Sequence, residues 1–299
     1  MRRVRGAVET VQTMRIRREH LWLVVTTAAV IAAAFSLLTK PIAAQNAAYR
    51  APRFVGTEHP DLSGIWQALN TANWDIQAHA AENGPFPGLL GAWGAVPAGL
   101  GVVEGNEIPY QPWALEKKKE NFSKRLTADP FNFHASGDPE AKCYLPGVPR
   151  ATYVPFPFQI LLSDKDILLS YEFDSATRII HMDAPKESPL DFRMGWSNGH
   201  WQGDTLVVDV TGLNGLAWFD RAGNFASDTL HVVERYTLAG SDHINYEATI
   251  EDPAVFTRPW KIRLPLYRRV EKNAQLLEFK CVEFAEELLY GQFKKQPAK

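Results

Sequence analysis

Short apolar runs separated by turn residues fill the second half of the chain, and this pattern constrains the fold most strongly. In the clearest run, residues 261–267, the apolar residues Ile262, Leu264 and Leu266 recur at every second position and therefore lie on one face of a β-strand. Because proline has no N–H to donate, Pro265 indicates that this strand lies at an edge of the sheet or at a bulge. Many short strands at even spacing are typical of a barrel or a sandwich.

The same reasoning places the other strands. The ranges that fit are residues 61–67, 158–163, 167–173, 178–183, 205–211, 230–238, 244–250 and 275–281. The first of them contains Gly64 and Trp66, and this Gly-x-Trp resembles the first-strand signature of lipocalin-like barrels, in which the tryptophan closes one end. We therefore expect a mainly β fold, an antiparallel meander closing into a lipocalin-like barrel.

One amphipathic helix is expected before the meander and a short one after it. Pro112 is favourable at a first helical position, and the helix is expected to run to about residue 126. The lysine run 117–119 is expected on its solvated face. Its apolar stripe is expected to consist of Trp113, Leu115, Phe122 and Leu126. The C-terminal helix is predicted over 283–290, before Gly291.

The segment 84–112 is dense in glycine and proline, which excludes a long helix or a regular ladder there. A loop this long in a compact domain is usually functional, often as a lid. An ordered wrap over one end of the barrel fits the composition equally well.

The N-terminal segment has the marks of a secretory signal. Arg17 and Arg18 precede an uncharged apolar run over residues 21–38, and Pro41 and Ala44 follow it. We expect cleavage after Ala44. The alternative is an uncleaved anchor, since a run of this length is near the lower limit for spanning a bilayer.

Residues 45–299 are expected to form a single β-rich domain that works in the periplasm or outside the cell. Residues 1–44 hold seven of the 32 basic and two of the 34 acidic residues, so the remainder carries a net charge of −7. An acidic domain of this kind has no electrostatic footprint for nucleic acid. A membrane is expected as a partner only through the N-terminal segment, if that segment stays uncleaved.

The two cysteines, Cys143 and Cys281, are expected to form a disulfide bond, because an even number in an exported chain favours pairing. The alternative is a pair of buried free thiols. No metal site is expected at either cysteine, since no second Cys or His lies at chelating spacing beside it.

Six sequence blocks together resemble one family. They are DLSGIWQ (61–67), CYLPGVPR (143–150), GHWQGDTLVVDVTG (199–212), LHVVERY (230–236), TIEDPAVFTRPW (249–260) and LLEFKCVEF (276–284). The set resembles a widespread, largely uncharacterised group of secreted bacterial proteins with a GHWxGDTLVVD…HVVERY signature. The resemblance implies export and a common fold, and it implies no activity.

Several catalytic patterns are absent from the sequence, among them G-x-S-x-G, H-E-x-x-H, the P-loop, C-x-x-C-H and the Rossmann fingerprint. The catalytic candidates are therefore polar residues in the meander, namely Asp220, Arg221, His231 and Glu234. In a regular strand His231 and Glu234 face opposite sides, so they cannot hold one metal ion. A core-facing Glu234 needs a partner, for which Arg221 or Arg258 is suitable. The alternative is a structural ion pair.

Aromatic residues near these polar groups indicate a binding site. The candidate ligand-binding residues are Trp74, His79, His200, Trp201, Trp218 and Phe219. Charged residues among aromatic ones in a loop are typical of a pocket mouth. The alternative is that these side chains only pack the core.

The sequence thus predicts an exported barrel that binds an apolar or aromatic small molecule. An enzyme on the same scaffold is the first alternative: a lyase, isomerase or hydrolase using Asp220, His231 and Glu234 as acids or bases and Arg221 to stabilise negative charge. A structural protein of the cell envelope is the second. The sequence identifies no cofactor and no metal site.

Export makes a direct prediction. N-terminal sequencing of the periplasmic or secreted protein should begin at Gln45, within a few residues, because Ala44 ends the expected signal. Recovery of the intact chain from the cytosol would contradict this.

Overall fold

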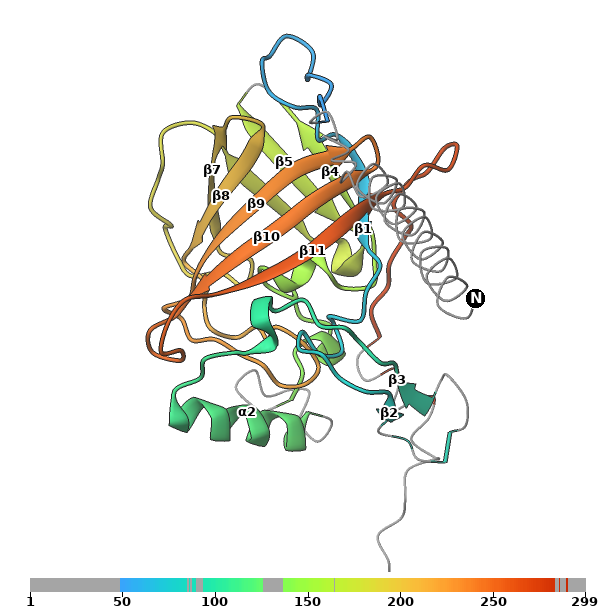
Figure 1. Cartoon of the computed structure of the whole chain (residues 1–299), viewed down its shortest axis with the longest axis vertical. Helices are drawn as coiled ribbons and strands as arrows, with labels where there is room; N and C mark the ends of the chain where they lie inside the picture. The colour runs from blue at the N-terminus through green and yellow to red at the C-terminus, as the bar shows by residue number, and fades with distance from the viewer. Residues whose placement is uncertain are drawn as a thin grey trace, which may run out of the picture. The chain divides into compact units, whose positions relative to one another are not determined.

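The computed structural model in Figure 1 describes residues 49–84, 86, 88–89, 94–125, 137–163, 165–282, 285 and 289. The expected signal segment and most of the expected C-terminal helix at 283–290 lie outside these residues. Within the described part, no helix is long and apolar enough to cross a bilayer.

Nine of the described strands form a closed barrel, which confirms the mainly β fold (Figure 1). They are β1 (Gly64–Ala68), β4 (Phe158–Leu162), β5 (Asp166–Tyr171), β6 (Thr177–His181), β7 (Trp196–Gln202), β8 (Thr205–Thr211), β9 (His231–Gly240), β10 (His243–Glu251) and β11 (Trp260–Arg268). From β4 to β11 each strand pairs with the next, and β1 closes the barrel between β4 and β11. All pairs are antiparallel except β6 with β7.

The barrel interior is filled by side chains, as the width of a small barrel allows. Strand β9 shows how alternation produces this, since every second residue from Val232 to Leu238 is buried. The largest of the almost completely buried strand residues are Trp66, Phe158, Ile160, Ile167, Leu169, Tyr236 and Tyr246.

The Trp66 side chain of the Gly-x-Trp in β1 is completely buried in this core. The indole of Trp66 donates to the carbonyl of Leu62 at 2.9 Å, and the guanidinium of Arg268 lies 4.2 Å above the indole ring. A side chain at Gly64, whose φ is +138°, would collide with Arg268, so this position requires glycine.

Two expected details of the strands are wrong. The expected strand at 275–281 has no regular structure. Strand β7, in addition, was not predicted, because a polar stretch with Gly199 shows little apolar alternation. The edge or bulge expected at Pro265 is also wrong, since β11 lies between β10 and β1 and pairs with β10 in continuous register. The nitrogen of Pro265 lies on the β1 side of the strand, one residue beyond Leu266, the last residue that β1 pairs, so no ladder hydrogen bond is lost.

The helix before the meander exists, but its buried face differs from the predicted one. Helix α2 spans Pro112–Lys124 and buries Ala114 and Asn121. Trp113, Leu115 and Phe122, expected in the core, are 55%, 42% and 38% exposed. The reason is a tight contact with the loop at Gly223, whose carbonyl accepts from the amide of Asn121 at 3.2 Å, so that small and polar residues form the interface.

The segment rich in glycine and proline is an ordered wrap in its described part. It begins directly after β2 (Glu82–Asn83) and contains β3 (Ala95–Val96), and the two strands pair as a short antiparallel hairpin. Further along, the amide of Arg263 in β11 donates to the carbonyl of Val102 at 2.8 Å, which attaches the segment to the barrel wall.

The strand parity of Glu234 is confirmed, and its partner is Arg178 on β6 rather than Arg221 or Arg258. Both side chains are buried inside the barrel. The hydroxyls of Tyr236 and Tyr246 donate to the same carboxylate at 2.9 and 2.8 Å, and Arg178 donates to the hydroxyl of Ser197 at 2.7 Å. Glu234 therefore has the structural ion pair that was one of its two predicted roles.

This pair predicts a strong dependence of stability on both partners. Arg178→Met should lower the free energy of unfolding by about 3–5 kcal/mol, because it leaves a buried carboxylate without its cation. Adding Glu234→Gln should recover part of the loss, as urea denaturation of the single and double variants can measure. Lys119→Met, which removes an exposed partner of Glu116, is the control and should change stability little. An equal loss of unfolding free energy in Arg178→Met and in Lys119→Met would contradict the structural role of the buried ion pair.

Candidate functional site

The predicted site residues fall into three places. Glu234 lies inside the barrel, whereas His231 lies on its outer face between Asp209 and Glu251, at 3.1 and 3.3 Å. Asp220 and Arg221 lie in the loop before β9, which contacts α2 through Gly223. The structure therefore does not bring the four catalytic candidates together.

The predicted ligand-binding residues are also divided. Phe219 and Trp218 are buried, and the ring of Phe219 packs 5.5 Å from that of Trp260. Trp201 stacks on His59 at 4.9 Å, next to the exposed His200. Trp74 and His79 line a large pocket, whereas Trp218 and Phe219 line a separate cavity of only about 10 Å³.

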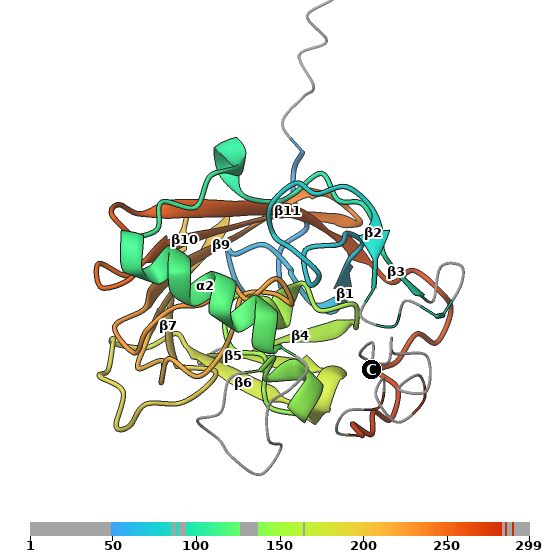
Figure 2. The same cartoon turned by 90° about the horizontal axis from the view of Figure 1, so that it is seen from below.

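The pocket has a volume of about 630 Å³. Figure 2 looks onto the end of the barrel where α2 and the β2–β3 hairpin lie, and both contribute lining residues. The lining residues that the structure describes include none from the nine barrel strands. Six aromatic side chains dominate the wall: Trp74, Phe86, Phe122, Phe156, Phe173 and Phe279.

Three of these phenylalanines meet because of strand register and the disulfide bond. Phe158 on β4 pairs with Tyr171 on β5, so Phe156 and Phe173, each two residues beyond that pair, come to face each other at 5.6 Å. Phe279 packs on them at 4.8 and 5.0 Å.

The disulfide between Cys143 and Cys281 holds Phe279 there. Their Cα atoms lie 5.6 Å apart, which confirms the expected bond. The bond attaches the C-terminal segment to the pocket wall, to which Cys281 itself contributes.

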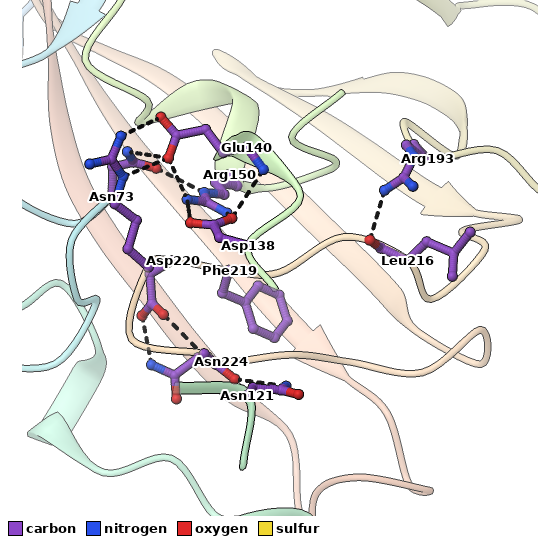
Figure 3. Close-up of polar contacts among 12 residues, drawn as sticks. Asn73, Asn121, Asp138, Glu140, Arg150, Arg193, Leu216, Phe219, Asp220 and Asn224 are labelled. Carbon is purple, nitrogen blue, oxygen red and sulfur yellow. Dashed lines mark hydrogen bonds and ion pairs between the residues drawn. The ribbon is translucent and has the colours of Figure 1, made fainter. Parts of the chain in front are cut away.

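A buried polar network supports another part of the pocket wall (Figure 3). The guanidinium of Arg150 donates to both carboxylate oxygens of Asp138 at 2.8 and 3.0 Å, to Glu140 at 3.0 Å and to Asn73 at 2.8 Å. Arg221 donates to both oxygens of Glu140 at 2.7 and 3.0 Å. Although burial raises the pKa of Glu140, Arg221 and Arg150 lower it to about 2.

The network also positions the aromatic wall. The guanidinium of Arg221, held in place by Glu140, lies 4.4 Å from the centre of the Trp74 ring. Arg221 thus connects the buried charges to the pocket surface, and Trp74 is presented to the pocket by a group that cannot easily move.

Asp220 joins two loops beneath this wall (Figure 3). It accepts the amide of Ile76 at 2.9 Å and both the backbone and side-chain N–H groups of Asn224 at 3.2 and 2.6 Å. Burial, and then the charge of Asp75, raise the pKa of Asp220 to about 7 against these hydrogen bonds. Asp75 lines the pocket, and burial raises the pKa of this carboxyl as well.

The described residues contain no group of three or more His, Cys, Asp or Glu side chains that could hold a metal ion. Comparison of the chain with protein-family models, curated proteins and solved structures finds no match.

Sequence reasoning missed Asp138, Glu140 and Arg150, as well as the three clustered phenylalanines. Arg150 ends the block CYLPGVPR, which was used only for family resemblance. A charged residue among apolar and turn residues, close to a predicted disulfide, was the available signal.

The two carboxyl groups predict opposite effects of pH on stability. Since the pKa of Asp220 is raised from 3.8 to about 7 in the folded state, its contribution is fully present below pH 3.8 and is lost as pH rises to about 7. Asp220→Asn should remove this loss, which is up to about 4 kcal/mol at about 1.4 kcal/mol per pKa unit. The contribution of Glu140 runs the other way, present above pH 4.5 and lost as pH falls to about 2.

Urea denaturation at several pH values measures both effects. Asp228→Asn, which removes an exposed carboxyl from the same loop, is the matched control. Parallel stability curves for the wild type and Asp220→Asn between pH 4 and 7 would contradict the assignment.

Proposed function

We propose that this protein is an exported barrel protein that binds an apolar or aromatic small molecule in the pocket at the end of its barrel. The observation that carries the proposal is the aromatic wall made by Phe156, Phe173, Phe279 and Trp74. A volume of about 630 Å³ falls within the range of roughly 300–1,000 Å³ usual for small-molecule sites.

The position of the site follows from the packing of the barrel. Its centre holds Tyr236, Tyr246 and the pair of Arg178 and Glu234, all nearly or completely buried. The end pocket, by contrast, has partly exposed aromatic rings that gain from contact with an apolar ligand, because burial of apolar surface is worth about 25 cal/mol per Å².

The enzyme alternative loses two of its residues at this site. Glu234 and His231 do not line the pocket, whereas Arg221 does and Asp220 lies directly before it in the chain. Arg221 is bound to Glu140, and Asp220 accepts hydrogen bonds from three N–H groups. Both residues therefore have a structural role that explains their position. Binding is therefore the function that the geometry supports best.

Export and family membership complete the proposal. The signal-like N-terminus and a disulfide bond both fit an oxidising compartment outside the cytoplasm. The family resemblance of the sequence blocks supports the same location.

A neutral fluorescent ligand tests the binding function. N-phenyl-1-naphthylamine, whose emission rises in apolar surroundings, should bind saturably at one site. Phe156→Ala should weaken binding about tenfold, since a stacked aromatic pair and its buried area contribute roughly 1–2 kcal/mol.

Phe192→Ala is the control, because Phe192 is 40% exposed and lies outside the pocket. Near-ultraviolet circular dichroism verifies that each variant is folded. The proposal fails if binding is not saturable, or if Phe156→Ala and Phe192→Ala bind the probe alike.

A further inference from the structure

The pocket-facing side of α2 differs from the rest of that helix. Lys118, Phe122 and Arg125 line the pocket, and spacings of four and three residues place them on one helical face. The neighbouring lysines belong to the outer surface and form ion pairs within the helix: Lys117 and Lys124 with Glu120, and Lys119 with Glu116. The run 117–119, expected to be solvated throughout, is thus divided, and Lys118 turns toward the pocket.

The two pocket-facing cations lack such partners. Neither Lys118 nor Arg125 forms an ion pair with a carboxylate in the part of the chain that the structure describes. The guanidinium of Arg125 lies 3.8 Å from the centre of the Phe122 ring and donates from Nη1 to the Phe122 carbonyl at 2.6 Å. Its Nε and Nη2 groups make no hydrogen bond with described residues. Burial lowers the pKa of this arginine, and the nearby charges of Glu82 and Asp138 oppose that effect only in part. An anion beside it would restore the stabilisation of the charge that burial removes.

Most carboxylates of the pocket are already bound. Asp138 and Glu140 are held by Arg150 and, for Glu140, by Arg221. Asp75 accepts the amide of Gln77 at 2.9 Å, and its raised pKa, caused by burial, makes the charged form less favourable. Glu82 on β2 is the remaining carboxylate of the pocket, and its charge acts on Arg125 without forming an ion pair among the described residues. Because the two cations Lys118 and Arg125 face this one carboxylate, the α2 wall keeps a positive charge for a ligand.

We propose that the ligand is an amphiphilic anion, whose oxyanion group binds Lys118 and Arg125 at the α2 wall while its apolar body lies against Phe156, Phe173 and Phe279. The inference rests on the proposed binding function and adds the charge of the ligand class. The guanidinium of Arg125 suits a carboxylate or sulfonate, because its N–H groups present a planar fork to two oxygens.

A pair of probes with the same aromatic body isolates the charge. 8-Anilino-1-naphthalenesulfonate is N-phenyl-1-naphthylamine with one added sulfonate. We expect the sulfonate to bind about tenfold more tightly than the neutral probe, since one or two hydrogen bonds to charged groups supply such a factor. Displacement of the neutral probe by 1-naphthoate and by 1-naphthylmethylammonium extends the comparison to a carboxylate and a cation. We expect 1-naphthoate to displace the probe at a lower concentration than 1-naphthylmethylammonium does.

Helix variants assign the effect to its residues. In Lys118→Met and Arg125→Met the affinity ratio of the sulfonate to the neutral probe should fall about three- to tenfold toward one. Lys119→Met removes the same charge from the exposed face of the same helix and should keep the wild-type ratio. An unchanged ratio in both pocket variants, or tighter binding of the ammonium compound than of 1-naphthoate, overturns the anion proposal.

The two proposals fail in different ways. If the neutral probe binds in the pocket but the sulfonate and 1-naphthoate gain nothing, the anion proposal is wrong and the binding function stands. If no probe binds saturably, the binding function itself is wrong.

Discussion

A completely buried guanidinium, that of Arg150, is the interaction on which the site depends. Arg150 lies in the turn before β4, and its partners Asn73, Asp138 and Glu140 come from the segment after β1 and the segment after α2. Strands β1 and β4 pair directly, with Gly64 opposite Ile160, so the barrel itself brings the two neighbouring segments together. Once these segments meet, carboxylates have to neutralise the buried guanidinium, because an unpaired buried charge would lower the stability of the fold by several kcal/mol.

The other buried arginine has a different consequence. Arg178 and Glu234 occupy the centre of the barrel with two tyrosine hydroxyls and leave that centre packed. A barrel of this size can hold one small ligand or a filled core. Here the core is filled, and the pocket lies at the end of the barrel, where loops, α2, the β2–β3 hairpin and the disulfide-linked segment form a wall that no residue of the nine barrel strands lines.

Parts of this architecture could be read from local pattern. The alternation in 261–267 indicated a strand with one buried face, and the parity of β9 correctly placed His231 and Glu234 on opposite faces. A core-facing Glu234 was expected to need an ionic or hydrogen-bonding partner, as buried charged groups do. Which arginine supplies it could not be predicted, because Arg178 is 56 residues away and reaches Glu234 only through barrel closure.

The sequence by itself determined most of the strand pattern and the chemical types at Asp220, Arg221 and Trp74, because these follow from periodicity and local composition. The even number of cysteines favoured the pairing of Cys143 with Cys281. The tertiary structure alone decided where they meet. Local amphipathicity favoured burial of Trp113 and Phe122, yet the close approach of Gly223 to α2 selected Ala114 and Asn121 instead. The pocket likewise joins residues from Trp74 to Phe279, and contacts between segments so distant depend on strand register and a disulfide bond, which no local pattern encodes.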